Sequence, residues 1–269
     1  LGIPDLLGEG ARGSEELAAL TGSHSGSLYR LLRMLASVGV LTEDDERRFS
    51  LTSLGSRLRS DAAGSRSAWA KFLLRPPQLA AWGAILHSVR TGENAFCHVH
   101  GSDVWTYRTH QRDEGAIFDL AMRERSAQLA HTLLQRYDFA RFKQIVDVGG
   151  GDGTLLAGLL SSCPDASGTL FDLAPVVAGA TAVLREAGVS DRCTIVGGSF
   201  FECVPAGGDA YLLKYVLHDW DDHEALAILG NCHRAMTRDA KVLIVERIVR
   251  PPNEGVEAKL SDLNMLVIT

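Results

Sequence analysis

Residues 146–160 read VDVGGGDGTLLAGLL, and this stretch decides the fold. An apolar strand pattern leads into Gly149, Gly150, Gly151 and Gly153, and an apolar helical pattern follows them. Glycines at a strand-to-helix turn let a ligand approach the backbone closely, and the helix N-terminus behind them presents free N–H groups. The stretch therefore predicts an α/β fold with a nucleotide-like ligand at this turn.

The spacing of the glycines narrows the choice of ligand. A dinucleotide fingerprint G-x-G-x-x-G begun at Gly149 requires glycine where Thr154 stands, and no Lys follows to complete a phosphate-binding loop. The glycines fit instead an acid-x-Gly-x-Gly-x-Gly pattern that starts at Asp147. Asp172 follows 25 residues later, at the end of the next expected strand, where a carboxylate can accept hydrogen bonds from both hydroxyls of a ribose. This combination indicates S-adenosylmethionine, and a tight turn without any ligand is the alternative.

Outward from this turn, short apolar runs alternate with helical patterns. The expected strands are residues 145–148, 168–171, 193–196, 210–213 and 242–245, and helices are expected at residues 155–160, 176–186 and 225–235. Strands that alternate with helices predict a parallel sheet covered on both faces. The fold class is therefore α/β with a Rossmann-like sheet.

The N-terminal part has a different pattern. Two short helices are expected at residues 14–21 and 28–38, and two strands at residues 40–42 and 49–51 flank a charged turn. This helix-turn-helix and wing also occurs in DNA-binding regulators, so that function is a rival hypothesis. Between Ala11 and Ser60, however, seven Arg stand against four Glu and two Asp, a balance of only +1. Because a groove-reading helix needs a clearly positive face, a packing or dimerisation module is favoured.

Between these parts, residues 66–142 are expected to be mostly helical, with a break at Pro76-Pro77 and a looser connection from Thr91 to Ser102. We divide the chain into a winged-helix-like dimerisation part at residues 1–90, a helical linker at residues 91–138 that contributes to the substrate pocket, and a cofactor-binding part at residues 139–269.

Composition limits the partners of the chain. Its 269 residues are 46% hydrophobic and carry a net charge of −6, so we expect no general attraction to nucleic acid or to anionic membranes. A membrane span needs about 18 consecutive apolar residues, and no apolar run approaches that length. No secretion signal is recognisable. Five scattered cysteines without Cys-x-x-Cys pairs are typical of reduced thiols, so a cytoplasmic location is expected.

The segment LLKYVLHDWDD, residues 212–222, contains the candidate catalytic residue. His218 lies just past the carboxyl end of an expected parallel strand, where ligands of such folds bind. Its neutral imidazole can accept a proton near pH 7, as deprotonation of a phenol or an alcohol requires. Asp221 and Glu224 have capping-box spacing for the next helix, which gives them a structural role. Because capping accounts for part of this acidic cluster, no metal is expected, although a site around His218, Asp219, Asp222 and His223 is the alternative.

Five motifs in this order, VDVGGGDG, LFDLAPVV, GGSFFECVP, LLKYVLHDWDD and KLSDLNMLV, closely resemble the bacterial relatives of plant-type small-molecule O-methyltransferases. Members of that family transfer the methyl group of S-adenosylmethionine to hydroxyls of aromatic and polyketide natural products, and they use an N-terminal winged-helix module to form homodimers. The resemblance covers nearly the whole chain. It implies a small aromatic or polyketide acceptor and S-adenosylhomocysteine as product.

For the cofactor, the resemblance assigns residues one by one. Gly149 and Gly151 would contact the methionine part, Asp172 the ribose and Leu173 the adenine. Ser199, followed by Phe200, stands where the family usually has an Asp near the adenine amino group, so a weaker contact is expected there. The resemblance also places Lys214 and Ser126 beside the cofactor.

For the reaction, the resemblance makes His218 the general base, Glu246 the acid that orients it, and Asp262 a second polar orienting contact. Met122, Asn264 and Met265 would face the substrate. Phe118 and Trp220, together with His98, His100 and Trp105, indicate a pocket suited to aromatic rings, although aromatic residues at helical spacing also occur in cores.

Three rival functions remain open from the sequence. One is a methyltransferase-like protein with altered chemistry, such as a hydroxylase or a decarboxylase, because a scaffold does not fix its reaction. The others are the regulator discussed above and a non-catalytic dimer partner. The family also implies a further helix and a strand pair after Val267, so we expect that part of the acceptor site lies beyond Thr269.

Overall fold

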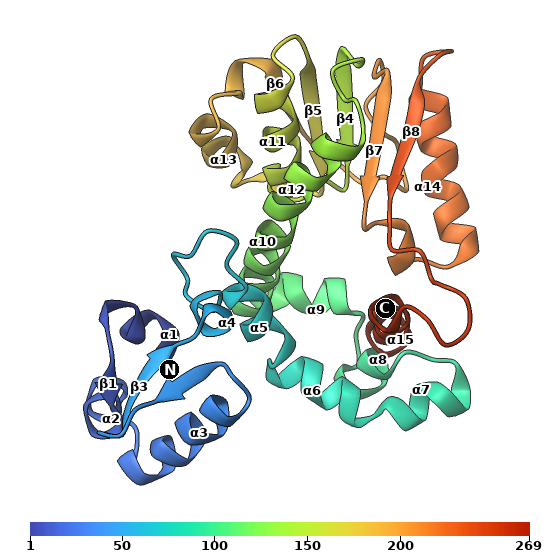
Figure 1. Ribbon diagram of the computed structural model, residues 1–269. Coiled ribbons are helices and arrows are strands. Elements are labelled where there is room, and N and C mark those ends of the chain that lie inside the picture. The colour runs from blue at the N-terminus through green and yellow to red at the C-terminus, as the bar shows by residue number, and fades with distance from the viewer. The chain divides into compact units, whose positions relative to one another are not determined.

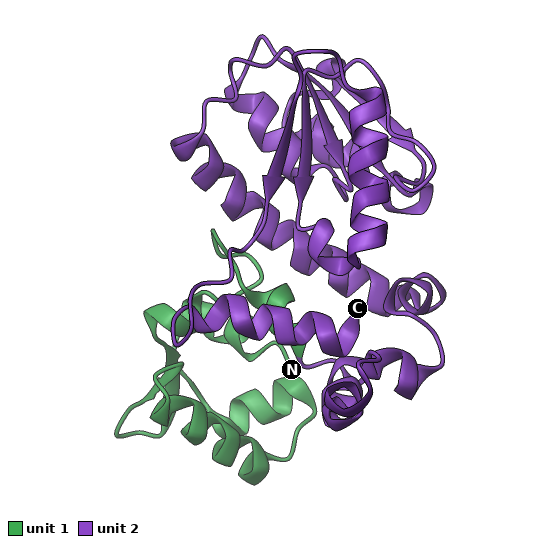
Figure 2. Ribbon diagram, turned by 90° about the vertical axis from the view of Figure 1, so that its right-hand side faces the viewer, with its two compact units in different colours: residues 1–73 green, residues 74–269 purple.

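The computed structural model describes the whole chain, Leu1–Thr269, which forms two compact units, Leu1–Leu73 and Leu74–Thr269 (Figure 2). Each unit has its own hydrophobic core, as a separate folding unit requires. The division into residues 1–90, 91–138 and 139–269 by role stays a prediction.

The first unit is a small winged helix-turn-helix. Its elements are α1 (Ile3–Leu6), η1 (Leu7–Glu9), β1 (Arg12–Gly13), α2 (Ser14–Thr21), α3 (Ser25–Ser37), β2 (Leu41–Glu43), β3 (Arg48–Leu51), α4 (Ser53–Ser56) and α5 (Ser67–Leu73). Gly22 caps the C-terminus of α2 with a φ of +63°, a left-handed conformation that residues with a side chain rarely adopt. Leu17, Leu32 and Phe49 are fully buried between the helices and the antiparallel wing of β2 and β3. The predicted helix, turn, helix and wing are confirmed.

The second unit combines helices with one large sheet (Figure 1). Before the sheet come α6 (Pro76–Gly83), α7 (Ile85–Thr91), α8 (Ala95–His100), α9 (Val104–His110) and α10 (Arg112–Arg136). The alternating part contains β4 (Gln144–Val148), α11 (Thr154–Ser162), β5 (Ser167–Asp172), α12 (Ala174–Val177), α13 (Ala180–Glu186), η2 (Ser190–Arg192), β6 (Cys193–Gly197), β7 (Ala210–Lys214), η3 (Leu217–Asp219), α14 (Asp222–Ala235) and β8 (Lys241–Val245). Helix α15 (Val256–Ile268) follows the last strand.

The five strands of this sheet are all parallel and run in the order β6-β5-β4-β7-β8. The five strands predicted from the sequence are therefore confirmed. The chain moves outward from β4 through β5 to β6, and then returns to the other side of β4 for β7 and β8. Ligands of open parallel sheets bind outside the carboxyl ends of the strands where the order reverses. This topology places the glycine turn after β4 at the binding edge.

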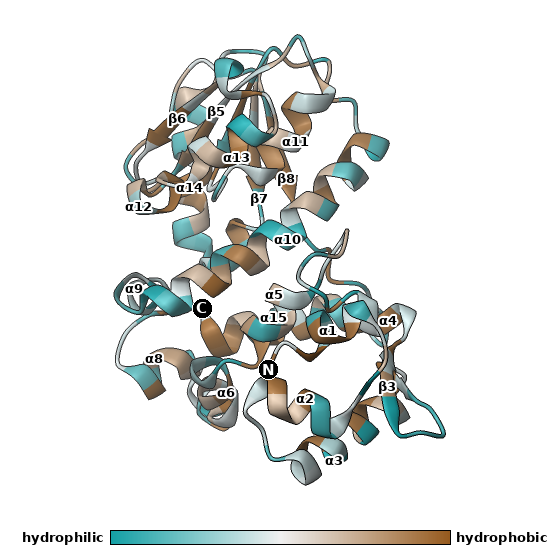
Figure 3. Ribbon diagram, turned by 90° about the vertical axis from the view of Figure 1, so that its left-hand side faces the viewer, coloured by the Kyte–Doolittle hydropathy of each residue, from teal (hydrophilic) through white to brown (hydrophobic).

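Alternate side chains of each strand point to opposite faces of the sheet, and helices cover both faces. Ile145 and Leu212 pack on one face with α10, α11 and α13, whereas Val146 and Tyr211 pack on the other with α14. The strands accordingly carry mostly hydrophobic colours in Figure 3. A rigid sheet covered in this way holds the loops at its carboxyl edge in fixed positions.

The expectation of a loose connection from Thr91 to Ser102 is wrong in its central part. Ala95–His100 is helix α8, because the Asn94 side chain accepts a hydrogen bond from the Cys97 N–H and caps the first turn. Ala95 and Phe96 are buried with Val267 and Ile268 of α15. The C-terminal helix therefore packs among the helices that precede the sheet.

Candidate active site

The glycine turn after β4 is shaped by close backbone approaches. Gly149, Gly151 and Gly153 have φ values of +70°, +64° and +82°, which side-chain-bearing residues rarely adopt. A Cβ at Gly150 would lie 2.5 Å from Leu170 Cδ1, whereas a Cβ at Gly151 would meet no atom within 4 Å. The turn is therefore tightly packed beneath Gly150 and open at Gly151, as a cradle for a ligand requires.

A buried carboxyl group lies directly under this turn. Asp147 is 1% exposed, and neither of its carboxyl oxygens has a hydrogen-bond partner. Burial raises the pKa of Asp147, and the nearby charge of Lys214 opposes that rise. Burial likewise lowers the pKa of Lys214. The turn therefore covers a titratable carboxyl group that no protein donor satisfies.

Asp172 at the end of β5 is held in a fixed orientation by the backbone. Its Oδ2 accepts the Gly151 N–H at 2.8 Å, and its Oδ1 accepts the Leu173 N–H at 2.7 Å. Burial raises the pKa of Asp172, and these two N–H groups oppose the rise. Each oxygen keeps a further lone pair for a ligand hydroxyl. Leu173 beside it is 50% exposed, so its side chain is accessible to a flat ring.

Helix α10 lies across the carboxyl edge and is tied to it at two places. Lys214 Nζ at the end of β7 donates to Ser126 Oγ at 2.9 Å, and Ser126 is buried. One turn earlier, Arg123 forms an ion pair with Asp152 of the glycine turn. Met122 is the neighbour of Arg123 and is half-buried on the same helix. The structure thus brings Ser126 and Lys214, predicted separately, into direct contact.

Ser199 and Phe200 lie in the segment after β6. The Ser199 hydroxyl accepts the Phe201 N–H at 3.3 Å, so this side chain takes part in the local turn. The Phe200 carbonyl accepts a hydrogen bond of 2.7 Å from the Asn231 side chain, and its ring contacts Trp220 with centroids 5.9 Å apart. The backbone here is fixed by α14, whereas the contact of Ser199 with adenine stays a prediction.

His218 and Glu246, 28 residues apart in the chain, form a short hydrogen bond. Glu246 Oε2 lies 2.6 Å from His218 Nδ1, while Asp219 Oδ1 lies 3.6 Å from His218 Nε2. Burial lowers the pKa of His218, and so does the charge of Arg125. The hydrogen bond to Glu246 and the charges of Asp219 and Glu246 outweigh these two effects, so the pKa of His218 is raised. Burial also raises the pKa of Asp219 to about 6. Asp219, expected from the sequence only as an alternative metal ligand, thus lies beside the imidazole, a place that residue spacing does not indicate.

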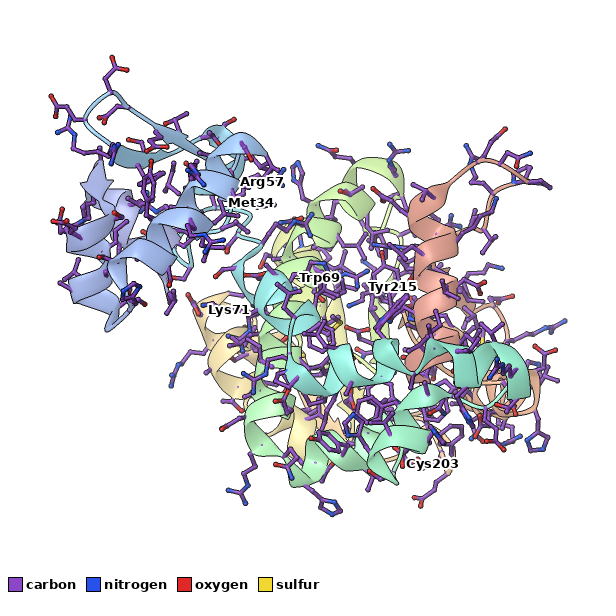
Figure 4. All side chains as sticks on the ribbon, turned by 90° about the horizontal axis from the view of Figure 1, so that it is seen from below. Met34, Arg57, Trp69, Lys71, Cys203 and Tyr215 are labelled. Atoms are coloured by element: carbon purple, nitrogen blue, oxygen red, sulfur yellow. The ribbon has the colours of Figure 1, made fainter.

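Tyr215 connects the groups around His218. Its backbone has a φ of +56°, a strained value for a residue with a side chain, and its N–H donates to the Val245 carbonyl at 3.0 Å. This bond continues the pairing of β7 with β8 by one residue beyond Lys214, at Val245, which directly precedes Glu246. The ring of Tyr215, labelled in Figure 4, lies 5.7 Å from the His218 ring. The turn therefore fixes the position of His218 relative to Glu246.

The other predicted substrate residues fall into two groups. Phe118 and Trp220 both lie near Trp105, with ring centroids 5.8 Å and 6.3 Å from it. Asn264 instead accepts a hydrogen bond of 3.0 Å from Trp82 Nε1. Met265 lies beside Asn264 on α15 and is half-buried.

Asp262 is the predicted site residue that the structure does not bring to His218. It is exposed on α15 and makes no hydrogen bond or ion pair with His218. Asp219 occupies the position near His218 Nε2 in its place.

No group of three His, Cys, Asp or Glu side chains has a geometry that could hold a metal ion. None of the helices combines the length and the apolar character of a membrane span.

Comparison with known proteins settles the family. Residues 82–269 match the O-methyltransferase domain, and residues 1–61 match the O-methyltransferase dimerisation domain. The chain belongs to this family. It is an S-adenosylmethionine-dependent O-methyltransferase with an N-terminal dimerisation domain.

Individual relatives agree along nearly the whole chain. The phenazine O-methyltransferase PhzM of Lysobacter antibioticus is 42% identical over 268 residues, which cover 100% of this chain and 78% of the relative. The crystal structure of LaPhzM superposes with a TM-score of 0.94 at 42% identity, covering 99% of this chain and 80% of that one. The structure of the O-methyltransferase NcsB1 from neocarzinostatin biosynthesis superposes with a TM-score of 0.83 at 35% identity, covering 99% of this chain and 80% of that one. It was solved with S-adenosylmethionine and 2-hydroxy-5-methyl naphthoic acid.

The residues at the carboxyl edge fit this methyltransferase cofactor. The backbone at Gly151 has room for a ligand, and each oxygen of the oriented Asp172 carboxylate keeps a lone pair that can accept a ribose hydroxyl. Their chemistry suits a nucleoside without a phosphate chain.

Proposed function

We propose that this protein methylates a hydroxyl group of an aromatic or polyketide-type small molecule in natural-product biosynthesis, with His218 as the general base. The observation that carries the proposal is the 2.6 Å contact between His218 Nδ1 and Glu246 Oε2 at the carboxyl edge of the sheet. This contact lies on the same edge as the glycine turn and Asp172. A base and a cofactor cradle at one edge are what a methyl transfer to oxygen requires.

The pairing with Glu246 defines what His218 can do. A carboxylate at Nδ1 favours the tautomer in which Nδ1 carries the proton, so Nε2 keeps its lone pair for the acceptor hydroxyl. As Nε2 takes that proton, the imidazole becomes positive, and Glu246 and Asp219 both stabilise the new charge. Because a base must be neutral before it acts, the raised pKa of His218 predicts that activity falls as the pH drops through a value above the ordinary 6.5 of histidine.

Cofactor binding is the task of the residues around β4 and β5. We assign Gly149, Gly151 and Asp172 to the nucleoside and its methionine tail. Adenine would lie beside Leu173, Ser199 and Phe200, and the methionine tail beside Lys214 and Ser126. When bound, S-adenosylmethionine supplies a methyl group on a positively charged sulfur that leaves as a neutral thioether. The protein aligns the acceptor oxygen with this methyl carbon, and such alignment can lower a reaction barrier by about 7–11 kcal/mol.

The acceptor is assigned to the aromatic cluster of Trp105, Phe118 and Trp220, together with Met122 of α10. Flat rings pack against one another edge-to-face or offset, so a cluster of this kind suits an aromatic acceptor. The name of the phenazine relative and the naphthoic acid bound to NcsB1 are consistent with that class. Asn264 and Met265 are assigned to the rim of the same site.

The experiment is to incubate the purified protein with S-adenosylmethionine and a panel of hydroxylated aromatic acids, phenols and polyketides, and to measure product masses. A product heavier by one CH₂ unit supports the proposal, and fragmentation should place the methyl group on oxygen. A product that has gained an oxygen atom or lost carbon dioxide would show the altered chemistry of a hydroxylase or a decarboxylase.

We also propose that the protein acts as a homodimer through its dimerisation domain. Large apolar side chains are exposed on the first unit, among them Leu20, Leu31, Met34 and Val38, and burial of such groups against a second copy is favourable. Sedimentation velocity at micromolar concentration should give the mass of two chains. A monomer over the whole accessible concentration range would rule this arrangement out.

A further inference from the structure

Tyr215 has an unfavourable backbone conformation directly after β7. Its φ of +56° lies in the left-handed region, which bulky residues rarely adopt and which glycine adopts freely. The backbone N–H of Tyr215 donates to the Val245 carbonyl at 3.0 Å, and a glycine would donate the same bond. The turn by itself therefore gives no reason for a tyrosine. Strained residues of this kind cluster at functional sites, so the side chain is where a reason is to be sought.

The left-handed turn brings the ring of Tyr215 to two cations. Neighbouring side chains of a strand point to opposite faces of the sheet, yet Lys214 Nζ lies 5.3 Å from the centroid of the Tyr215 ring. The guanidinium carbon of Arg125, on α10, lies 4.8 Å from the same centroid. Both distances are those of cation–π contacts. The ring thus holds two positive groups that come from different elements.

The same ring contacts the imidazole of His218. The two ring centroids are 5.7 Å apart and the ring planes are inclined by 65°, an edge-to-face arrangement. The His218 side chain is 32% exposed, and its hydrogen bond to Glu246 holds it at Nδ1 only. A side chain that is open on one side and held at one atom can rotate unless a neighbour packs against it. The ring of Tyr215 is such a neighbour.

Glu246 also lies near a cation other than His218. It directly follows Val245, which pairs with Lys214 across the parallel strands β7 and β8. Hydrogen bonds of a carboxylate to an ammonium or a guanidinium are charge-assisted on both sides, so such a cation competes with a neutral imidazole for the carboxylate. Contacts that hold Lys214 and Arg125 at the Tyr215 ring therefore favour the pairing of Glu246 with His218.

We propose that Tyr215 is a positioning residue for the base: its ring keeps the His218 imidazole paired with Glu246 and holds Lys214 and Arg125 apart from that pair. The side chain acts through its ring, since the ring makes the contacts with all three groups. The inference rests on the proposed function for its effect on turnover, because it assumes that His218 is the base. The pairing itself can be measured without an acceptor.

The test uses three variants of Tyr215. Tyr215→Phe keeps the ring, whereas Tyr215→Asn and Tyr215→Gly remove it and tolerate the left-handed backbone. Imidazole ¹⁵N NMR at alkaline pH, with the protein saturated in S-adenosylhomocysteine, reports the tautomer of His218, whose signal is the one that His218→Ala removes. The wild type and Tyr215→Phe should carry the proton mainly on Nδ1. Both variants without the ring should show a mixture of the two tautomers.

Turnover should follow the tautomer. With an acceptor identified by product mass, kcat of both variants without the ring should fall about 10- to 100-fold, and that of Tyr215→Phe should stay within about twofold of the wild type. The Kd for S-adenosylhomocysteine should change less than about threefold in all variants, because Ser126 still holds Lys214. Thermal denaturation verifies that each variant is folded at the assay temperature.

Tyr137→Leu is the matched control. It removes an exposed ring that packs near Phe139 and Phe142 before β4, at the opposite edge of the sheet, so tautomer and turnover should stay as in the wild type. A His218 proton that remains mainly on Nδ1 in both variants without the ring would overturn the inference, as would equal losses of turnover in Tyr215→Phe and in those variants. Wild-type turnover of His218→Ala would instead contradict the base in the proposed function, so the two are distinguished.

Discussion

The proposed cofactor end and the proposed acceptor end of the site are built in different ways. At the cofactor end, Gly149, Gly151 and Asp172 are held by backbone geometry, with a left-handed turn and N–H groups that donate to the carboxylate. At the acceptor end, His218 depends on the side chain of Glu246, which directly follows β8 and lies 28 residues later in the chain. The first end follows from local sequence, and the second exists only when the sheet has formed.

Because of this difference, substitutions at the two ends should separate binding from catalysis. Changes at the cofactor end should alter affinity for the nucleoside and leave the proton transfer intact. Changes at the acceptor end should alter turnover, its pH dependence or acceptor choice, with cofactor affinity preserved. Substitutions of four residues can test this separation, beginning with the one whose loss should cost most.

The largest effect is expected for His218→Ala. Loss of a positioned base costs typically about 10²–10⁴-fold in rate, so kcat should fall by that factor while the Kd for S-adenosylhomocysteine changes less than about twofold. Steady-state kinetics and calorimetry measure the two quantities. The control is His233→Ala, because His233 is exposed on α14 away from the carboxyl edge. Unchanged turnover with a good acceptor would remove His218 from the role of base.

The opposite pattern is expected for Asp172→Asn. The amide keeps the shape of the side chain but loses the charge that strengthens the hydrogen bond from the Gly151 N–H and that would strengthen those from ribose hydroxyls. Affinity for S-adenosylmethionine should weaken about 10- to 100-fold. At saturating cofactor, kcat should recover to within about threefold of the wild type. Asp165→Asn, an exposed change on the loop after α11, is the control and should alter neither value.

Glu246→Gln should affect the pH profile of catalysis. The amide retains an acceptor oxygen for His218 Nδ1 but removes a negative charge, so the raised pKa of His218 should fall. Asp219, which also raises that pKa, and Arg125, which lowers it, remain in place. The acid limb of kcat should therefore move to lower pH, while the plateau falls about tenfold because the imidazolium is less stabilised. An acid limb at the wild-type position would show that Glu246 does not control the base.

The smallest effect is expected for Asn264→Ala. Its side chain accepts the hydrogen bond of Trp82 Nε1 at 3.0 Å, so the change should lower the free energy of unfolding by about 1 kcal/mol and the melting temperature by about 2–4 °C. Because Asn264 is assigned only to the rim of the acceptor site, KM for the acceptor should change little. A KM raised tenfold with an unchanged melting temperature would instead place Asn264 against the acceptor.

Much of the fold could be predicted from the sequence because its signals are local. The apolar runs that became β4, β5, β6, β7 and β8, the winged helix and the capping box of Asp221 and Glu224 all depend on residues close together in the chain. The prediction failed at residues 95–100, where Asn94 was interpreted as part of a loop although it caps helix α8. The same residue types favour both loops and caps, and only burial of Phe96 against α15 distinguishes them.

The place of the glycine turn could be predicted from local sequence, because glycines at this spacing after a strand permit the positive φ values that other residues rarely adopt. The folded chain was needed to show that Asp219 rather than Asp262 lies beside His218, that Ser126 meets Lys214, and that Phe118 and Trp220 lie near Trp105. These contacts join side chains that are distant in the chain or whose direction depends on a turn such as the strained one at Tyr215. Residue spacing specifies local backbone geometry, whereas side-chain partners are chosen when the sheet and the helices around it pack.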